Sequence, residues 1–337
     1  MPTVTIRDIA RDAGVSTTTV SHVVNGTRIV SAAVKARVDA SIENLGYVPN
    51  AAARSLRRNR TWSIGVVVPN CSNPFFAEML AGVEDAAFAA DISVILCNAH
   101  DDPQRQRRHL RLLTEKQVDA VLLLSVGEDE RLAGQLLGLA VPHVVVDRDV
   151  AGLAVDSVRV DHAAGGRLAA VHLLDLGHRA IACITGPMAL SSARQRHEGF
   201  VQEFERRGIS LNDSMVCASD FTASGGYAAA SRLLDSSNGP TAIFAANDLM
   251  AIGALRAVRE CGLRLPDDLA VVGFDDIALA SQSSPPLTTV AQPKAELGAL
   301  AARVLIDRVA RPDRSPVTHV LQPHLVVRES TSRAAEQ

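Results

Sequence analysis

The chain has 337 residues, of which 47% are apolar and 21% charged, and its formal net charge is −3. This length predicts two or three compact domains, and the composition excludes a disordered, collagen-like or coiled-coil protein. No apolar run approaches the ~18 residues of a membrane span, and the N-terminus has no apolar signal-peptide core. Five scattered cysteines, none in a metal-binding spacing, favour reduced thiols. We therefore expect a cytoplasmic protein without a membrane partner.

Enzyme motifs are missing from the sequence. It contains no nucleotide-binding glycine loop, no hydrolase nucleophile motif and no zinc-protease motif. Two acids, Asp248 and Asp275, could serve an enzyme, but neither a nucleophile–base pair nor a metal cluster supports that alternative. We expect no enzyme activity, no cofactor and no metal site.

The charge is unevenly divided along the chain. Residues 1–60 hold nine Lys and Arg against four Asp and Glu, a net charge of +5, so the remainder carries −8. A small basic segment on an acidic body indicates a polyanionic partner for that segment, although a solvated surface patch would give the same count.

Three short helices are predicted in the basic segment. Thr5 caps the first, which ends at Gly14; Ser16 caps the second; Ser31 begins the third, which Gly46 ends. Each has apolar residues at helical spacing on one face: Ile6, Ile9, Ala10 and Ala13; Val20, Val23 and Val24; Val34, Val38, Ile42 and Leu45. Two helices joined by about three residues are typical of a helix-turn-helix, which we place in residues 1–48.

The second helix exposes small polar side chains on its other face, namely Thr17, Thr18, Ser21, His22 and Asn25. A recognition helix needs such short hydrogen-bonding groups, because it must enter the ~12 Å major groove without clashing. These residues are the candidate base-reading set. Taken alone, an ordinary solvated helix face is the better explanation of these residues.

Residues 49–60 predict a short hinge helix and linker. Asn50 can cap a run of good helix formers that contains Arg54, Leu56 and Arg57. A leucine among arginines fits a side chain that wedges into a minor-groove step, with the arginines on phosphates. The alternative is a linker whose leucine packs on the body.

The rest of the chain alternates short β-branched strands with helices. Strands are expected at 64–68, 94–97, 121–124, 144–146, 181–184, 243–245 and 269–273. Helices are expected at 75–90, 103–116, 163–176, 194–207, 224–235 and 248–261. This order predicts an α/β body of two doubly wound parallel-sheet lobes with a cleft at the strand ends. The break near Asp161, and late segments at 287–292 and 317–327 that cross back, predict lobes of 61–161 plus 293–322 and of 162–292 plus 323–337.

Polar and aromatic residues gather at the strand ends, where a ligand in the cleft would meet them. They are Asn73, Phe75, Phe76, Asp147, Arg148, Arg196, Phe221, Asn247, Asp275 and Gln292. Aromatic rings against the apolar face of a sugar, with carboxylates, amides and arginines around its hydroxyls, suit a small polyol. For any single residue a turn, a helix cap or a core position is an equally good explanation.

The run from Thr5 to Val23, together with Ala53-Arg54-Ser55-Leu56, resembles the DNA-binding head and hinge helix of the LacI family. Within that family the run Ser16 to Val23 is most similar to the ribose and purine repressors. The resemblance implies that Thr17, Thr18 and His22 read the major groove, that Leu56 intercalates at a central C-G step, and that Arg54 and Arg57 lie near phosphates. The body resembles the periplasmic ribose-binding protein, which implies ribose contacts at the ten strand-end positions.

These observations predict a homodimeric transcriptional repressor that binds a palindromic DNA operator and is controlled by a small sugar. A pentose such as ribose is favoured as effector; a purine or another small metabolite is the alternative, and a sugar-binding protein without a DNA role is a further one. Both signs of response occur in the family, and our hypothesis is a sugar-induced repressor. The C-terminal tail has no apolar heptad, which favours a dimer over a tetramer.

Overall fold

The computed structural model describes residues 4–47, 60–124, 130–147, 154–236 and 239–331. The chain divides into two compact units on either side of the Thr61–Trp62 bond. We call the first unit the head and the second the body. The predicted hinge helix falls outside the described residues.

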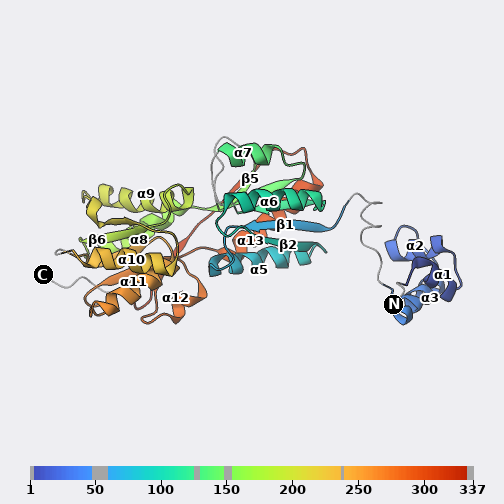
Figure 1. The fold of residues 1–337 in the computed structure, drawn as a ribbon, viewed down its shortest axis with the longest axis horizontal. Helices are drawn as coiled ribbons and strands as arrows, with labels where there is room; N and C mark the ends of the chain where they lie inside the picture. The colour runs from blue at the N-terminus through green and yellow to red at the C-terminus, as the bar shows by residue number, and fades with distance from the viewer. Residues whose placement is uncertain (1–3, 48–59, 125–129, 148–153, 237–238, 332–337) are drawn as a thin grey trace. The chain divides into compact units, whose positions relative to one another are not determined.

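The head consists of three helices, α1 (Ile6–Asp12), α2 (Thr17–Asn25) and α3 (Ala32–Leu45), which are labelled in Figure 1. The Asp8 carboxylate accepts from the backbone N–H of Thr5 at 2.9 Å and from its hydroxyl at 2.7 Å. The Ser16 hydroxyl accepts from the Thr19 N–H at 3.0 Å and so caps α2. These bonds satisfy backbone and side-chain groups that the helix starts leave open.

The core of the head is small and aliphatic. Its buried residues are Ile9, Ala10, Ala13, Val20 and Val38, with partly buried neighbours that include Ile42 and Tyr47. Leu45, which the apolar spacing of α3 includes, is instead exposed. Tyr47 occupies the core beside Ile42, because the left-handed Gly46 turns the chain back over it.

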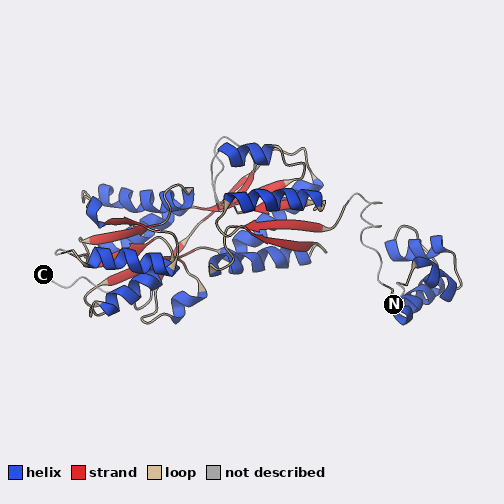
Figure 2. Ribbon diagram, in the orientation of Figure 1, coloured by secondary structure: helices blue, strands red, loops and turns tan. Residues whose placement is uncertain are grey.

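The body contains two six-stranded sheets, and each sheet forms the centre of one lobe (Figure 2). The first lobe orders its strands β11-β5-β4-β3-β1-β2, and every neighbouring pair is parallel. Its strands are β1 (Ser63–Val68), β2 (Ser93–Asn98), β3 (Ala120–Leu123), β4 (His143–Val146), β5 (Asp156–Val160) and β11 (Thr318–Leu321). Its helices are α5 (Pro74–Phe88), α6 (Pro103–Glu115), α7 (Glu130–Leu137) and α13 (Lys294–Ala310).

The second lobe orders its strands β12-β10-β9-β8-β6-β7, and all pairs are parallel except β10–β12. Its strands are β6 (Ile181–Thr185), β7 (Val216–Ala218), β8 (Ala242–Ala245), β9 (Ala270–Asp275), β10 (Thr288–Ala291) and β12 (His324–Val326). Its helices are α8 (His162–Asp175), α9 (Ser191–Arg206), η1 (Asp213–Met215), α10 (Ala223–Leu234), α11 (Asp248–Glu260) and α12 (Ala278–Gln282).

Helices cover both faces of each sheet, as Figure 2 shows. In the first lobe α5 and α13 pack on one face, and α6 and α7 pack on the other. In the second lobe α8 and α9 cover one face, and α10 and α11 the other. Burial on both faces explains the near-continuous aliphatic runs in the central strands, and the predicted α/β class of two parallel-sheet lobes is confirmed.

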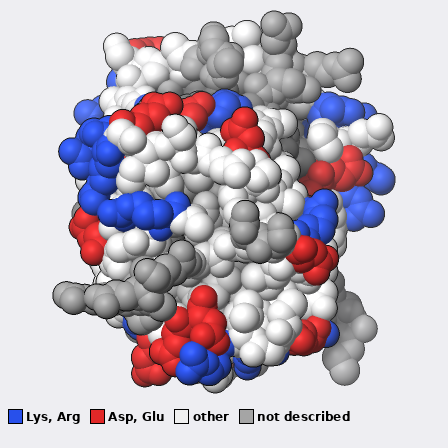
Figure 3. Space-filling model, turned by 90° about the vertical axis from the view of Figure 1, so that its left-hand side faces the viewer, with Lys and Arg blue, Asp and Glu red and all other residues white. Residues whose placement is uncertain are grey.

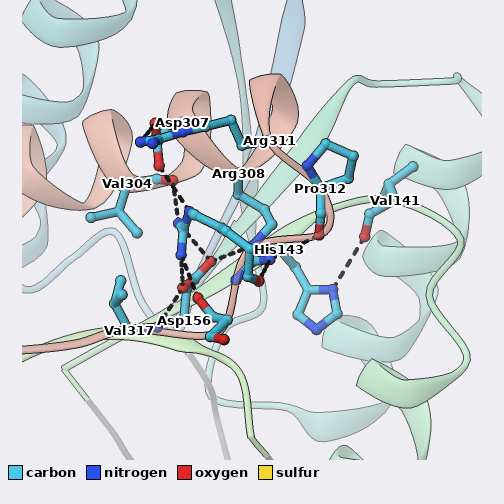
Figure 4. Close-up of polar contacts among 11 residues, drawn as sticks. Val141, His143, Asp156, Val304, Asp307, Arg308, Arg311, Pro312 and Val317 are labelled. Carbon is cyan, nitrogen blue, oxygen red and sulfur yellow. Dashed lines mark hydrogen bonds and ion pairs between the residues drawn. The ribbon is translucent and has the colours of Figure 1, made fainter.

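The chain passes between the lobes three times, after β5, after β10 and after β11. An ionic cluster fixes the end of α13 and the start of β11 to β5, as the close-up shows (Figure 4). The buried Asp156 carboxylate accepts from Arg308 at 2.6 Å and from Arg314 at 2.7 and 3.0 Å. It also accepts from the Val317 N–H at 2.8 Å. The cluster therefore holds the edge strand from which the third passage departs.

Candidate functional site

The polar face predicted for α2 is accessible in the head. Thr17 and Thr18 are exposed, whereas Ser21, His22 and Asn25 are partly buried. The Asn25 amide donates to the Ser21 carbonyl at 2.8 Å, and His22 Nδ1 lies 2.9 Å from the Thr27 hydroxyl. The two threonines at the start of α2 are therefore the most accessible of the five, and the later three are held by local hydrogen bonds.

Three residues predicted to contact DNA, namely Arg54, Leu56 and Arg57, lie outside the described residues, as does Arg148 of the predicted pocket. Their roles stay predictions. The basic excess of the first 60 residues contrasts with the end of the body that Figure 3 shows, where acidic and basic side chains are interspersed.

A cavity of about 660 Å³ lies between the two lobes of the body. Eight of the predicted effector residues line it: Asn73, Phe75, Phe76, Asp147, Arg196, Phe221, Asn247 and Asp275. Its other lining residues are Asn70, Ser72, Asp101, Pro187, Ala189, Leu190, Ser192, Asp220, Thr222, Ala223 and Leu249. The size falls in the range of small-molecule sites, and the cavity lies at the strand ends where the topology predicts a cleft.

The first lobe contributes an aromatic wall at the start of α5. Asn73 caps this helix, because its side-chain oxygen accepts from the Phe75 N–H at 3.0 Å. Pro74 is the first helical residue, where its missing N–H costs nothing. The rings of Phe75 and Phe76 meet edge to face, with centroids 5.2 Å apart. This local sequence thus fixes two rings and an amide at the cavity.

The second lobe contributes a buried cation, Arg196 of α9. Its guanidinium donates to the Ala246 carbonyl at 2.7 Å and lies 3.9 Å from the centroid of the Phe274 ring. Its Nη1 is 3.4 Å from a carboxylate oxygen of Asp275. Since both side chains are about 95% buried, this ion pair is shielded from solvent.

Burial raises the pKa of Asp275 to about 6, although Arg196 and a hydrogen bond from Gln292 lower it. The Asp147 carboxylate adds to the rise by repulsion. Gln292 Nε2 donates to Asp275 Oδ1 at 2.7 Å, and Gln292 is not among the lining residues of the cavity. Gln292 therefore holds a carboxylate that lines the cavity, without lining the cavity itself.

His162 contacts one cavity-lining residue from each lobe, and the strand-end pattern did not predict it. Its Nε2 lies 3.2 Å from a carboxylate oxygen of Asp147, and its Nδ1 accepts from Arg196 Nε at 3.3 Å. Asp147 follows β4 of the first lobe, whereas Arg196 belongs to the second. The first residue of α8 thus connects polar groups from both walls, at the passage that follows β5.

Asn247 and Phe221 of the second lobe also line the cavity and are hydrogen-bonded to each other. Asn247 caps α11 and donates from Nδ2 to the Phe221 carbonyl at 3.0 Å. Phe221 has a positive φ of 65°, a backbone conformation that this bond helps to hold. Its ring covers Gly186, where a Cβ would come within 2.2 Å of the ring, so a side chain at 186 would displace it.

Asp248, one of the two candidate acids for an enzyme, is fully buried and not among the lining residues. It accepts from the Ile277 N–H at 2.8 Å and from the Thr289 hydroxyl at 2.6 Å. Burial, reinforced by repulsion from Asp275, raises the pKa of Asp248 well above its ordinary value. Its contacts are those of a structural carboxyl that fixes the segment after β9.

The remaining lining residues also follow strands. Asp101 lies just after β2, the run from Pro187 to Ser192 follows β6, and Asp220 and Thr222 follow β7. The same strand-end rule would have found them, once β7 was recognised and the search was extended a few residues beyond each strand. Among the described residues no group of three or more His, Cys, Asp or Glu could hold a metal ion. None of the described helices is long and apolar enough to cross a membrane.

A helix-turn-helix head joined to a two-lobed body with a ligand-sized cavity defines the class of DNA-binding regulators controlled by a small molecule. Two family models match the sequence. Residues 5–50 match the bacterial regulatory proteins of the lacI family, and residues 170–331 match the periplasmic binding protein-like domain.

Relatives match over almost the whole chain. The ribose operon repressor of Escherichia coli strain K12 is 42% identical over 97% of this chain and 99% of its own. The HTH-type transcriptional repressor PurR of Photobacterium profundum is 39% identical, over 97% of this chain and 98% of its own. The chain belongs to the LacI family of bacterial transcriptional regulators, and these relatives are repressors rather than enzymes.

Solved structures give the same family. The lac repressor dimer bound to operator and the anti-inducer ONPF matches with a TM-score of 0.89 and 30% identity, over 98% of this chain and all of its own. A LacI family regulator from Enterococcus faecium with bound ribose matches with a TM-score of 0.73 and 32% identity, over 81% of this chain and all of its own.

Proposed function

We propose that the protein is a homodimeric repressor that binds a palindromic DNA operator through its heads and is released from it by a small sugar, with D-ribose favoured. The observation that carries the proposal is the cavity between the lobes, in which a phenylalanine pair from one lobe faces a buried arginine–aspartate pair from the other. Rings pack on the apolar face of a sugar, and the charged groups bond its hydroxyls. The likeness to a ribose operon repressor and to a ribose-bound regulator supports the same effector.

On this proposal Thr17, Thr18 and His22 read bases, Ser21 and Asn25 support them, and the hinge of residues 49–60 inserts Leu56 while Arg54 and Arg57 contact phosphates. The lac repressor dimer on its operator supports both the dimer and the DNA partner. We keep the segment boundaries predicted from the sequence, and place the protein in the cytoplasm because its DNA target is there.

The response follows from linkage. A ligand that contacts both lobes stabilises the lobe arrangement in which those contacts coincide, and it changes operator affinity by its difference in affinity between arrangements. Contacts from Phe75 and Asp147 on one side, and from Arg196 and Asp275 on the other, give a sugar that preference. Gln292 contributes by holding the Asp275 carboxylate.

A purine effector is the second candidate, because a PurR repressor is nearly as similar in sequence. A flat base could stack on Phe76 or Phe221, whereas a polyol makes more use of the carboxylates at the cavity. Isothermal titration of the full chain with D-ribose and, separately, with hypoxanthine distinguishes the two. Saturable binding of ribose alone supports the proposal, and saturable binding of hypoxanthine alone replaces the effector while keeping the regulator.

A further inference from the structure

The segment that follows β9 has an unusual backbone. Asp275 and Asp276 are consecutive residues with positive φ, at 112° and 54°. Non-glycine residues adopt this region at a cost, so a pair of them persists when surrounding groups hold the chain in place. Because the Asp275 side chain lines the cavity, the geometry of this segment sets where that carboxylate lies.

Lys294 is the group that holds the two carbonyls. Its Nζ donates to the carbonyl oxygen of Asp275 at 2.8 Å and also to that of Asp276. Lys294 is 8% exposed and is the first residue of α13. A buried cation at a helix N-terminus is unfavourable both by desolvation and against the helix dipole, so its contacts must offset that cost.

The same ammonium group pairs with Glu78, which belongs to the first lobe, as Lys294 itself does. Lys294 Nζ lies 3.3 Å from Glu78 Oε2, and Glu78 Oε1 accepts from the Ala278 N–H at 3.2 Å. Glu78 lies one turn after Phe75 on α5, the helix that presents the phenylalanine pair. The paired Lys294 and Glu78 of the first lobe therefore both bond the second-lobe segment after β9, Lys294 through the Asp275 and Asp276 carbonyls and Glu78 through the Ala278 N–H. These contacts tie the turn that presents Asp275 to the helix that presents Phe75 and Phe76.

We propose that Lys294 and Glu78 form a clasp between the lobes that positions Asp275 for effector recognition and sets the spacing of the two cavity walls. The inference rests on the proposed function, because it assigns the clasp to effector binding. Lys294 is a positioning residue: it contacts the backbone that carries Asp275 and is not among the residues lining the cavity.

The test compares the full chain with its Lys294→Met, Glu78→Gln and Lys116→Met variants. Lys116 is exposed at the end of α6, so the last variant removes a lysine remote from the clasp. Titration with D-ribose is expected to give roughly tenfold weaker binding, or weaker still, for Lys294→Met. Glu78→Gln is expected to be intermediate, since its amide oxygen still accepts from Ala278. The Lys116→Met variant should match the wild type.

A second readout does not depend on the ligand. Hydrogen exchange of the segment from Asp276 to Gln282, measured on ligand-free protein, should be faster in Lys294→Met and Glu78→Gln than in Lys116→Met. Operator binding of ligand-free Lys294→Met should stay within about threefold of wild type, which separates lost positioning from unfolding. Affinity and exchange equal to those of Lys116→Met would overturn the clasp. If exchange is faster in the two clasp variants but the wild type does not bind ribose, the clasp is supported and ribose is rejected as the effector.

Discussion

If Asp275 binds the effector as proposed, we predict that effector affinity depends on pH. The pKa of Asp275 is raised to about 6, chiefly by burial. Only the ionised carboxylate can accept two sugar hydroxyl bonds while remaining paired with Arg196. With this pKa, about nine tenths of the molecules carry the charge at pH 7 and about one tenth at pH 5. We therefore expect ribose affinity to fall about tenfold between pH 7 and pH 5.

Titration calorimetry of wild type and Asp275→Asn from pH 5 to pH 7.5 measures this. The Asn side chain cannot ionise, so its affinity should be flat over the range and lower at pH 7, by about 1.5–3 kcal/mol for a lost bond to a charged group. The sign follows because protonation removes the binding-competent form, so affinity is lost as pH falls through the folded pKa. A flat profile for the wild type, or an equal slope in Asp275→Asn, would refute the assignment of the charge to Asp275.

Three further predictions concern other parts of the chain. Arg196→Ala should abolish the response of operator binding to ribose while leaving operator affinity within a few-fold, measured by fluorescence anisotropy; a normal ribose titration would make Arg196 structural. Leu56→Ala should weaken operator binding and leave calorimetric ribose affinity unchanged, and unchanged DNA affinity would end the wedge role. Asp156→Asn should lower the free energy of unfolding by about 3–5 kcal/mol in urea, because it removes the fully buried carboxylate that pairs with the partly buried Arg308 and Arg314. Although burial raises it, hydrogen bonds from Arg308, Arg314 and Val317 hold the pKa of Asp156 below its ordinary value. The ionised Asp156 therefore contributes its full stabilisation above the pKa it has in the unfolded chain, and this contribution is lost as pH falls through the lower pKa of the folded state. An Asp156→Asn variant as stable as the wild type at pH 7 would contradict the role of the cluster.

The sequence predicted the parts of the fold that local patterns control. Caps such as Ser16 and helical spacing around Val20 act within a few residues, so the head could be predicted helix by helix. Strand–helix alternation predicted two parallel sheets, and the strand-end rule led to eight of the nineteen residues that line the cavity. Asn73 and Asn247 illustrate why single residues stayed ambiguous, because each caps a helix and lines the cavity as well.

Features that depend on distant contacts were missed. The strand β5 has the polar sequence Asp-Ser-Val-Arg-Val, which did not indicate a buried strand. Its Asp156 can be buried because the carboxylate pairs with arginines about 150 residues later. His162 gave no signal beyond a histidine at a helix start, since its partners come from two lobes. The helices α7 and α13 were not predicted, although α13 has apolar residues at clear helical spacing. Lys294 reads as an ordinary exposed lysine until the fold brings it to Asp275 and Glu78.

On the proposed function, the head of the protein binds DNA, the body binds a sugar, and the two binding events are coupled. The most direct test is fluorescence anisotropy of a labelled palindromic duplex with a central C-G step, at fixed salt, titrated with the full chain in the presence and absence of D-ribose. We expect tight, salt-dependent binding that ribose weakens at least tenfold. Binding that stays equally tight at saturating ribose, in a chain that calorimetry shows to bind the sugar, would contradict the coupling.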